Sequence, residues 1–385
     1  MEYFHQAQDW LLKLASEAKF FRENTPPSLM VMEKILELLG RPDRSFEWRI
    51  IVGGTAGKGT VCYRTEDVFL RQGKKVITLT SPHLQVVTER IRLNGKLIGS
   101  ELFGKAILQI RDIAAQLKLQ PTYYETIVLA GILTGKDAGC EIFIGEIGLG
   151  GRLDAVNVVG GKRIAALTFI GEDHLQHFGT LKNMAREKAG IFTSDSVLNL
   201  SYEKKFRDIL TEKGDVQFLT GIESKLNKKL SRKICERVLG HSDFQMQKIQ
   251  IPGRWEKIGN IILDNAHSAP RMKFILPKIK KIKGRKIGIL GLGKNHDPEI
   301  FKIIAPSLDE IIWTKMVGVR DFWDPKELQK KIGKGIIEPD PIKAFEKAKN
   351  DRGTVFVFGM FLSGEIRNLF YTPEKILSQQ TQFPK

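Results

Sequence analysis

The residues best suited to chemistry lie in a glycine-rich stretch from Gly53 to Thr60, GGTAGKGT, directly after the apolar run RIIV. A strand that leads through such a turn into a helix points backbone N–H groups and the positive end of the helix dipole at one place, which suits a phosphate. Lys58 would add charge at the terminal phosphates, and the hydroxyl of Thr60 would reach Mg²⁺. Gly59 separates these two residues, whereas the usual phosphate-loop pattern has no residue between them. A glycine turn without a ligand is the alternative, but the stretch favours phosphate binding.

A glutamate and a histidine accompany two other apolar runs. Glu146 lies near the end of CEIFIGEIG, and His174 follows RIAALTFIG. Ligands of open α/β folds bind where the carboxyl ends of parallel strands meet. A lone glutamate is usually a surface charge and a lone histidine a core residue. Together with the glycine loop, however, Thr60, Glu146 and His174 favour one site for a metal and a nucleotide.

Alternating strands and helices must position these residues. This alternation is the pattern of a mostly parallel α/β sheet, and 385 residues exceed one usual domain. We expect a phosphate-loop sheet domain over residues 1–250 and a smaller Rossmann-like α/β domain over residues 251–385. The polar, lysine-rich stretch 193–250 is weakly patterned, and we expect it to finish the first domain and lead to a linker. The predicted strands cover residues 49–52, 74–82, 140–151, 163–171, 260–267, 285–293, 310–315 and 354–361, and the predicted helices cover residues 29–39, 60–72, 100–117, 124–137 and 180–190.

The composition narrows the possible partners. The formal net charge is +17, which attracts anions such as nucleotides or polycarboxylates. The basic runs 224–233 and 278–286 lack the aromatic residues that stack on bases, which argues against nucleic acid. The apolar run 355–362 is too short to cross a membrane, and the N-terminus has no signal-peptide pattern. The three scattered cysteines predict reduced thiols in a cytoplasmic protein.

Five longer motifs then occur in a fixed order. They are GGTAGKGT, SPHL with TERIRLNG (81–95), EIGLGGRLDAVNVV (146–159), DHLQHFGTLKNMAREKAGI (173–191) and LDNAH (263–267). In these motifs, over about residues 25–367, the chain resembles the folylpolyglutamate synthase/dihydrofolate synthase family, a branch of the Mur ligase-like amide ligases. The loop of that family carries a glycine between its lysine and its Ser or Thr, as Gly59 does here. The family usually has Asn where this chain has Ala56.

The resemblance implies ATP, two Mg²⁺ ions and a monovalent cation as ligands. Lys188 matches the lysine that the family carboxylates to a carbamate, which turns a cation into an anion able to orient the second Mg²⁺. Without the match, Lys188 would be read as a helix-face lysine. The implied phosphate-binding residues are Gly54, Thr55, Gly57, Lys58, Gly59 and Thr60, and the implied metal ligands are Thr60, Glu146, His174 and Lys188.

In the second domain, Arg254, Asp264 and His267 match positions that meet ATP and the reacting centre across the cleft between the domains. The arginine fork suits anionic oxygens, the aspartate can accept ribose or amine hydrogens, and His267 is the candidate to help deprotonate the attacking amine. An orienting hydrogen bond is the alternative for His267. The chain departs from the family at Asn265 (usually Gly), Ser268 (usually Asn) and Met360 (usually Ser), and Ser363 lies near Met360 without occupying the same position.

The resemblance also implies a pterin site. The motif Ser81-Pro82-His83-Leu84 and the segment TYYETIVLAG (122–131) resemble the substrate loops of the family. Tyr124 would stack on a flat heterocycle, and Asp154 would bond its ring nitrogens. Core packing for the tyrosine and a turn role for the aspartate are the alternatives.

The implied reaction is the ATP-dependent joining of L-glutamate to a dihydropteroate or reduced-folate carboxylate through an acyl phosphate. Lys58, Lys188, Arg254 and His267 are the implied catalytic residues, in a protein expected to be monomeric and to bind neither nucleic acid nor membrane. A muramyl-type ligase with another carboxylate acceptor and a nucleotide-binding homologue that has lost catalysis remain open. The length of the region 193–250, which is short for the family, leaves open whether one or both folate activities are present.

Overall fold

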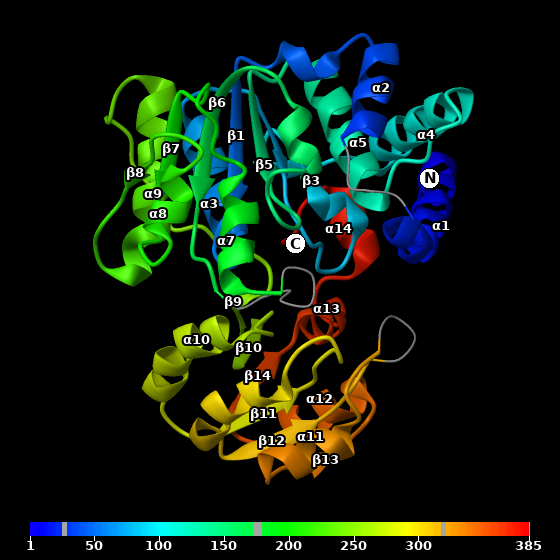
Figure 1. The fold of residues 1–385 in the computed structure, drawn as a ribbon. Helices are drawn as coiled ribbons and strands as arrows, with labels where there is room; N and C mark the ends of the chain where they lie inside the picture. The colour runs from blue at the N-terminus through cyan, green and yellow to red at the C-terminus, as the bar shows by residue number, and fades with distance from the viewer. Residues whose placement is uncertain (25–28, 172–178, 317–320, 385) are drawn as a thin grey trace. The chain divides into compact units, whose positions relative to one another are not determined.

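The computed structural model describes residues 1–24, 29–171, 179–316 and 321–384, which form two compact units (Figure 1). The N-terminal unit contains residues 1–83, 87–249 and 377–381. The C-terminal unit contains residues 84–86, 250–376 and 382–385. The chain therefore passes from one unit to the other several times, and each unit is described by itself.

An eight-stranded sheet forms the centre of the N-terminal unit, with the order β4-β3-β2-β5-β1-β6-β7-β8. All neighbouring strands are parallel except the pairs β2–β3 and β3–β4. The chain leaves β1 toward β2 on one side of it, and a later connection crosses from β5 on that side to β6 on the other. A ligand site is expected where the strand order reverses in this way. The strands are β1 (Trp48–Gly53), β2 (Val76–Leu79), β3 (Ile91–Leu93), β4 (Lys96–Leu97), β5 (Ile142–Glu146), β6 (Lys162–Leu167), β7 (Leu198–Ser201) and β8 (Gln217–Phe218).

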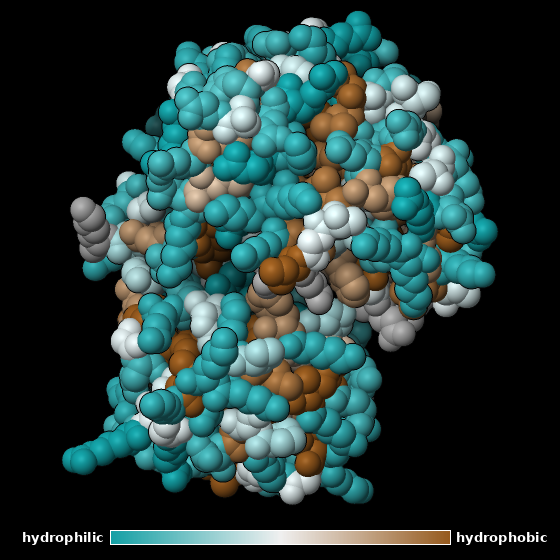
Figure 2. Space-filling model, turned by 90° about the vertical axis from the view of Figure 1, so that its left-hand side faces the viewer, coloured by the Kyte–Doolittle hydropathy of each residue, from teal (hydrophilic) through white to brown (hydrophobic). Residues whose placement is uncertain are grey.

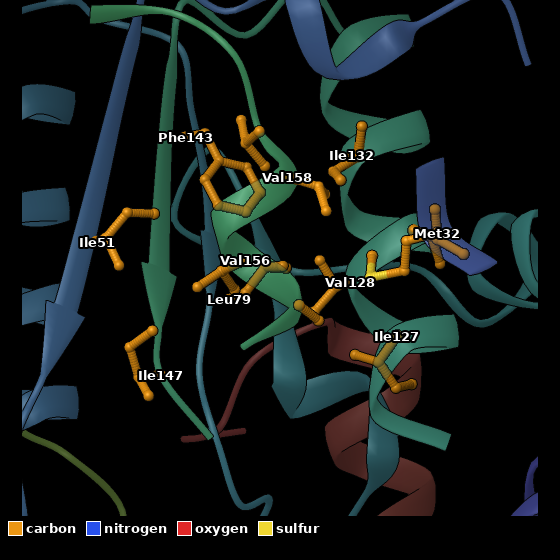
Figure 3. Close-up of a cluster of buried hydrophobic side chains, with 14 of the residues drawn as sticks. Met32, Ile51, Leu79, Ile127, Val128, Ile132, Phe143, Ile147, Val156 and Val158 are labelled. Atoms are coloured by element: carbon orange, nitrogen blue, oxygen red, sulfur yellow. The ribbon is translucent and has the colours of Figure 1, made fainter. Parts of the chain in front are cut away.

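Both faces of this sheet are covered, which explains the unbroken apolar run in β1. Successive side chains of a strand point to opposite faces. Ile51 therefore packs in one core cluster, whereas Ile50 and Val52 pack in the cluster on the other face. Figure 3 shows the first cluster, in which Ile51 and Phe143 of the sheet face Val128 of a covering helix. A strand that is buried on both faces needs apolar residues at every position, so no alternation is seen in the sequence.

The helices of the N-terminal unit begin and end close to the predicted positions. The helix that follows β4, residues 100–116, packs on the N-terminal helix, residues 2–24. Thr122 and Glu125 form a capping box at the start of the next helix. The helices are α1 (Glu2–Asn24), α2 (Met30–Leu38), α3 (Lys58–Arg71), α4 (Ser100–Gln116), α5 (Tyr123–Asp137), α7 (Leu181–Ala189), α8 (Arg207–Thr211) and α9 (Glu223–Leu239), with short 3-10 helices η1 (Pro42–Ser45), η2 (Val87–Arg90) and η3 (Ala155–Val158).

The region after residue 193 is more ordered than its sequence predicts. It adds β7, α8, β8 and α9 to the unit, and α9 packs against α3. Leu230, Ile234 and Cys235 of α9 are fully buried in the core cluster of that face. The prediction of a weakly patterned stretch is therefore wrong for α9. Its apolar residues recur at helical spacing, but the lysines around them lie on the solvent side and dominate the composition.

The C-terminal unit is built on a six-stranded sheet with the order β13-β12-β11-β14-β10-β9. Its strands are parallel except for the edge strand β9, which is antiparallel to β10. Ile262 and Leu263 of β10 pack in clusters on opposite faces, as in the first sheet. The elements are β9 (Arg254–Ile258), β10 (Ile261–Asp264), β11 (Lys286–Leu290), β12 (Glu310–Trp313), β13 (Ile336–Ile337), β14 (Thr354–Phe358), α10 (Ala269–Lys281), α11 (Pro325–Ile332), α12 (Pro341–Lys349), α13 (Met360–Asn368), α14 (Pro373–Gln379), η4 (Pro298–Ile303) and η5 (Ala305–Ser307).

The predicted fold class, two mostly parallel α/β sheets with covering helices, is thus confirmed. Within the described residues, no helix has the length and apolar character needed to cross a bilayer. Figure 2 shows mostly hydrophilic residues on the face turned to the viewer, with smaller apolar groups between them.

Candidate active site

The glycine loop joins the end of β1 to the start of α3, and two of its positions accept only glycine. Gly54 has φ +126°, and a Cβ there would lie 2.0 Å from Oγ1 of Thr168. Gly57 has φ +97° at the N-cap of α3, and a Cβ there would lie 2.6 Å from Nδ2 of Asn227. Both values lie in the region that favours glycine. The loop backbone is therefore held close to its neighbours at the N-terminus of a 14-residue helix.

Two lysine amines converge on this loop. Nζ of Lys58 donates to the carbonyl oxygen of Gly54 at 3.0 Å, and Nζ of Lys188 reaches the same oxygen at 3.4 Å. Lys188 lies in the last turn of α7 and is 6% exposed. Thr55 fixes the other side of the loop, since its N–H donates to the carbonyl oxygen of Phe169 at 2.7 Å. The result is that two lysine side chains lie beside the N-terminus of the helix, where an anion can bind.

The carboxylate of Glu146 lies beside the same helix start. It ends β5 and is 5% exposed. Its Oε2 accepts from the backbone N–H of Ser81 at 3.0 Å, and its Oε1 lies 4.0 Å from Nζ of Lys58. A Cβ at Gly59 would come within 3.4 Å of Oε2, so the missing side chain leaves this carboxylate open toward the first turn of α3, which contains Thr60.

The residues around Glu146 can be compared with the predicted metal site. The buried Glu146 carboxylate and a hydroxyl in the first turn of α3 are hard oxygen ligands of the kind that Mg²⁺ prefers, so their chemistry fits a magnesium ion. His174, the other predicted ligand, lies outside the described residues. Among the residues that the structure describes, no group of three or more His, Cys, Asp or Glu side chains could hold a metal. The described part of the predicted set is Thr60, Glu146 and Lys188.

The predicted pterin loop follows β2. Its Ser81–Pro82 peptide bond is cis. Nε of Arg90 donates to Nδ1 of His83 at 2.8 Å, and the Arg90 guanidinium lies over the ring of Tyr123 at 5.2 Å. Because an arginine nitrogen can only donate, Nδ1 of His83 is the acceptor in this bond. Arg90 therefore holds the His83 ring on the side of Nδ1.

The two other predicted pterin residues are engaged with the chain that follows Glu146. The Tyr124 hydroxyl donates to the carbonyl oxygen of Glu146 at 2.7 Å. Asp154 is 6% exposed and accepts from the N–H groups of Gly148 (2.8 Å), Leu149 (3.3 Å) and Val156 (3.1 Å). Burial raises the pKa of Asp154 to about 6, although these three N–H bonds act in the opposite direction. Burial also raises the pKa of Tyr124 well above its ordinary value, so this hydroxyl stays a donor.

A second group of predicted residues lies in the C-terminal unit. Asp264 ends β10 fully buried, and its carboxylate accepts from the N–H of Trp255 at 2.7 Å and from Nε of Arg271 at 2.9 Å, with a second bond from the Arg271 fork. Arg254 begins β9 and is exposed. His267 places Nδ1 2.7 Å from the carbonyl oxygen of Asn265.

Sequence reasoning missed several neighbours of these residues. Asn227 of α9 lies beside Gly57 and accepts from the Tyr202 hydroxyl at 2.8 Å. The ring of His296 lies 4.9 Å from that of His267. The pairing of Asp264 with Arg271 was missed as well. The sequence offers a signal for it, because Asp264 lies near the end of a predicted strand and Arg271 comes seven residues later, at the start of the next helix. Asn227 had no such signal, because it stands alone among lysines.

The hydroxyl of Ser363 does not point to a ligand. It is fully buried and donates to the carbonyl oxygen of Asp264 at 3.1 Å. Its role in the described structure is therefore to support the end of β10.

The fold and the loop define the class of protein. The Mur ligase middle domain matches residues 52–270, more than half of the chain, so the chain belongs to the Mur ligase-like proteins. Within them it belongs to the dihydrofolate synthase/folylpolyglutamate synthase family, as the sequence motifs predicted.

Two relatives support this assignment, and a solved structure shares the fold. The dihydrofolate synthase/folylpolyglutamate synthase of Buchnera aphidicola subsp. Schizaphis graminum is 30% identical over 290 residues, which cover 64% of this chain and 68% of the relative. The dihydrofolate synthetase of Saccharomyces cerevisiae is 26% identical over 361 residues, covering 77% and 84% of the two chains. The structure of Escherichia coli FolC in complex with DHPP and ADP has the same fold, with a TM-score of 0.79 at 23% identity over 94% of this chain and 97% of that one.

Proposed function

We propose that this chain is an ATP-dependent ligase that joins L-glutamate to the carboxylate of a pteroate or a reduced folate. The observation that carries the proposal is the convergence of Lys58, Lys188 and Glu146 on the glycine loop of a chain in this family. The substrate carboxylate attacks the γ-phosphorus of ATP and forms an acyl phosphate, with ADP leaving. The amine of L-glutamate then attacks the acyl carbon, and phosphate leaves as the amide forms.

The N-terminal unit binds and orients the triphosphate. Backbone N–H groups of Gly57, Lys58 and Gly59 at the helix start hold phosphate oxygens, and the Lys58 amine neutralises charge that builds up during transfer. The amine is already held at the loop by Gly54, so little reorganisation is needed. Positioning of this kind supplies most of the rate enhancement in phosphoryl transfer.

Thr60, Glu146 and His174 would hold a magnesium ion, which when bound screens the phosphate charge and polarises the bond to be broken. We further propose that Lys188 is carboxylated and holds a second magnesium ion, and that a monovalent cation binds beside it. The burial of Lys188 supports a group whose ordinary positive charge is replaced.

In the C-terminal unit, Arg254 binds anionic oxygens with its exposed fork. His267 accepts or relays the proton that the glutamate amine must lose. Asp264 belongs to the ATP site in this proposal. Its carboxylate accepts hydrogen bonds from Arg271 and from the N–H of Trp255, and so orients the start of β9 next to Arg254.

Ser81, Pro82, His83, Tyr124 and Asp154 form the pterin subsite in this proposal. The support is their common attachment to the strand ends. Ser81 bonds the Glu146 carboxylate, Tyr124 bonds the Glu146 carbonyl, and Asp154 bonds the next turn of chain. A pterin held there would have its carboxylate end free to reach the phosphate loop.

The test is phosphate release by the purified protein with ATP, Mg²⁺ and L-glutamate, compared with dihydropteroate, tetrahydrofolate and no pterin. Release that needs glutamate and dihydropteroate identifies dihydrofolate synthase, and release with tetrahydrofolate adds polyglutamylation. Lys58→Ala and Arg254→Ala should each lower kcat/KM by a factor of about 100 or more. The matched controls Lys136→Ala and Arg285→Ala remove exposed cations of the same units and should keep wild-type rates.

Normal turnover in both test variants would refute the proposal. Release with neither pterin would direct the search to muramyl-type carboxylate acceptors, and ATP hydrolysis that ignores glutamate would favour a regulatory nucleotide-binding protein. We also propose that the enzyme acts as a monomer in the cytoplasm, in accord with three buried free cysteines.

A further inference from the structure

A buried ion pair lies in the C-terminal unit, outside the residues assigned above. Arg367 of α13 donates through Nε to both carboxylate oxygens of Glu256 in β9, at 3.0 and 2.9 Å. Both side chains are fully buried. Taking two charges out of water is costly, and such pairs rarely stabilise a fold more than apolar residues of the same volume would. The pair therefore calls for a role other than general stability.

The rest of the Arg367 fork is used as well. Nη1 donates to Oε1 of Gln85, and Nη2 donates to the carbonyl oxygen of Gln382. The guanidinium also lies over the rings of Tyr371 at 4.4 Å and Phe383 at 5.1 Å. One side chain thus connects three segments that are far apart in the sequence.

Gln85 connects the ion pair to the predicted pterin loop. It comes two residues after His83, and residues 84–86 belong to the C-terminal unit. Its Nε2 donates to Oδ1 of Asn368 and to the carbonyl oxygen of Tyr371, both at 2.7 Å. Together with the Arg367 bond, these contacts engage both the nitrogen and the oxygen of the amide. The segment also lies directly on α13, since a Cβ at Gly364 would come within 2.5 Å of the Leu84 oxygen.

Glu256 connects the ion pair to the other two predicted segments. Its Oε2 accepts from the N–H of Gly253 at 2.8 Å, and the Gly253 oxygen accepts from the N–H of Asn265 at 2.8 Å. Gly253 directly precedes Arg254, and Asn265 directly follows Asp264. The helix α13 also contacts the end of β10 directly. The hydroxyl of Ser363, one turn before Arg367, donates to the carbonyl oxygen of Asp264.

We propose that the Arg367–Glu256 pair positions substrate segments of the ligase on two sides: the pterin loop through Gln85, and the loops of Arg254 and His267 through Gly253. The inference rests on the proposed function for its kinetic consequences. The pair touches no substrate and acts only through the residues it holds. Loss of the Gln85 branch should therefore weaken pterin binding selectively, whereas loss of the Glu256 branch should affect ATP and turnover.

The first experiment removes the Gln85 branch and leaves the ion pair in place. Gln85→Ala should raise the KM for the pterin acceptor about tenfold, the effect of one or two lost hydrogen bonds, and keep the KM for ATP within twofold. The matched control is Gln329→Ala, which removes a glutamine bond to a backbone oxygen at 2.6 Å elsewhere in the same unit. In the ligand-free protein, Gln85→Ala should also speed amide hydrogen exchange over residues 81–90, and the control should not.

The exchange readout separates the two ideas. A wild-type protein without turnover would defeat the proposed function, while faster exchange in Gln85→Ala would still support positioning. Unchanged exchange together with a pterin KM equal to that of the control would overturn the inference.

The second experiment addresses the Glu256 branch. Glu256→Gln keeps the shape but removes the charge, and it should lower kcat/KM for ATP about tenfold. The control Glu338→Gln breaks a pair with Lys347 that lies at the surface, with Lys347 half-exposed and Glu338 partly buried, and it should leave the kinetic constants unchanged. Arg367→Lys keeps the positive charge but lacks the guanidinium group that bonds Glu256 and Gln85 together. It should fold and have kinetic constants like those of Glu256→Gln. A lower melting temperature with unchanged kinetic constants in these variants would show a purely structural pair and contradict the proposal.

Discussion

The glycine at the N-cap of α3 offers a sharp test of the phosphate loop, because the same helix has a matched glycine just beyond its other end. Gly57 and Gly73 both have positive φ, +97° and +72°. A Cβ at Gly73 would meet nothing within 4 Å, whereas one at Gly57 would lie 2.6 Å from Nδ2 and 2.8 Å from Oδ1 of Asn227. Alanine should therefore cost a similar backbone free energy at the two positions, and only alanine at Gly57 should also collide with Asn227.

The expected sizes follow from these contacts. An L-residue in the left-handed region costs about 1–2 kcal/mol at either position. At Gly57, the Asn227 amide must also move, which strains its hydrogen bond with the Tyr202 hydroxyl and adds about 1 kcal/mol. We expect Gly57→Ala to destabilise the N-terminal unit by about 2–3 kcal/mol and Gly73→Ala by about 1–2 kcal/mol. In an Asn227→Ala background the cost of Gly57→Ala should fall to that of Gly73→Ala, a coupling of about 1 kcal/mol.

The assay is amide hydrogen exchange of peptides from β1 and β6, which reports the free energy of opening of this unit. ATP binding by calorimetry gives a second readout, since Gly57→Ala should weaken ATP at least about tenfold by crowding the helix start, and Gly73→Ala should not. Equal destabilisation by both substitutions, with no coupling to Asn227, would refute the geometry described for the loop.

Three further predictions use other parts of the structure. Glu146→Gln should raise the Mg²⁺ concentration needed for half-maximal phosphate release at least about tenfold, measured by metal titration; an unchanged titration curve would remove Glu146 from the metal site. The raised pKa of Asp154, about 6 in the folded protein against 3.8, means that the folded state binds the extra proton first, so stability gains about 2 kcal/mol as the pH falls from 8 to 4.5. Asp154→Asn should abolish that gain, and parallel curves of unfolding free energy against pH for the two proteins would contradict the assignment. Leu230→Ala in α9 should cost about 2–5 kcal/mol because the side chain is fully buried, whereas the exposed Lys228→Ala should change urea unfolding by less than about 0.5 kcal/mol.

The sequence was most informative where local patterns determine the structure. The apolar run around Ile50 and Ile51 predicts a strand buried on both faces, and the structure confirms it. The glycine spacing from Gly53 to Thr60 predicts a strand, a loop and a helix, which are all present. These features depend on backbone sterics and hydrophobic burial within a few residues, so a single sequence suffices.

Other features depend on contacts between distant segments. No pattern in the chain indicates that the N–H of Ser81 bonds Glu146, or that Asn227 lies against Gly57. The helix α9 was not predicted, because its many lysines obscure the helical spacing of its three core residues. Even a near neighbour such as Arg90 could not be paired with His83 from spacing alone, because the turn between them decides which side chains meet.

The crossing of the chain between the two units affects how the protein is made. Residues 377–381 belong to the N-terminal unit, where the N–H of Leu97 in β4 donates to the carbonyl oxygen of Gln380 at 2.9 Å and Leu377 packs on the core. The ribosome completes residues 250–376 of the C-terminal unit before it releases these residues. Until then, the N–H of Leu97 at the edge strand β4 does not have the Gln380 oxygen as its partner. Exposed strand edges of this kind promote aggregation. Expression of the first 250 residues alone would leave this N–H group without the Gln380 oxygen, and we expect addition of the segment 377–381 to reduce aggregation of the unit.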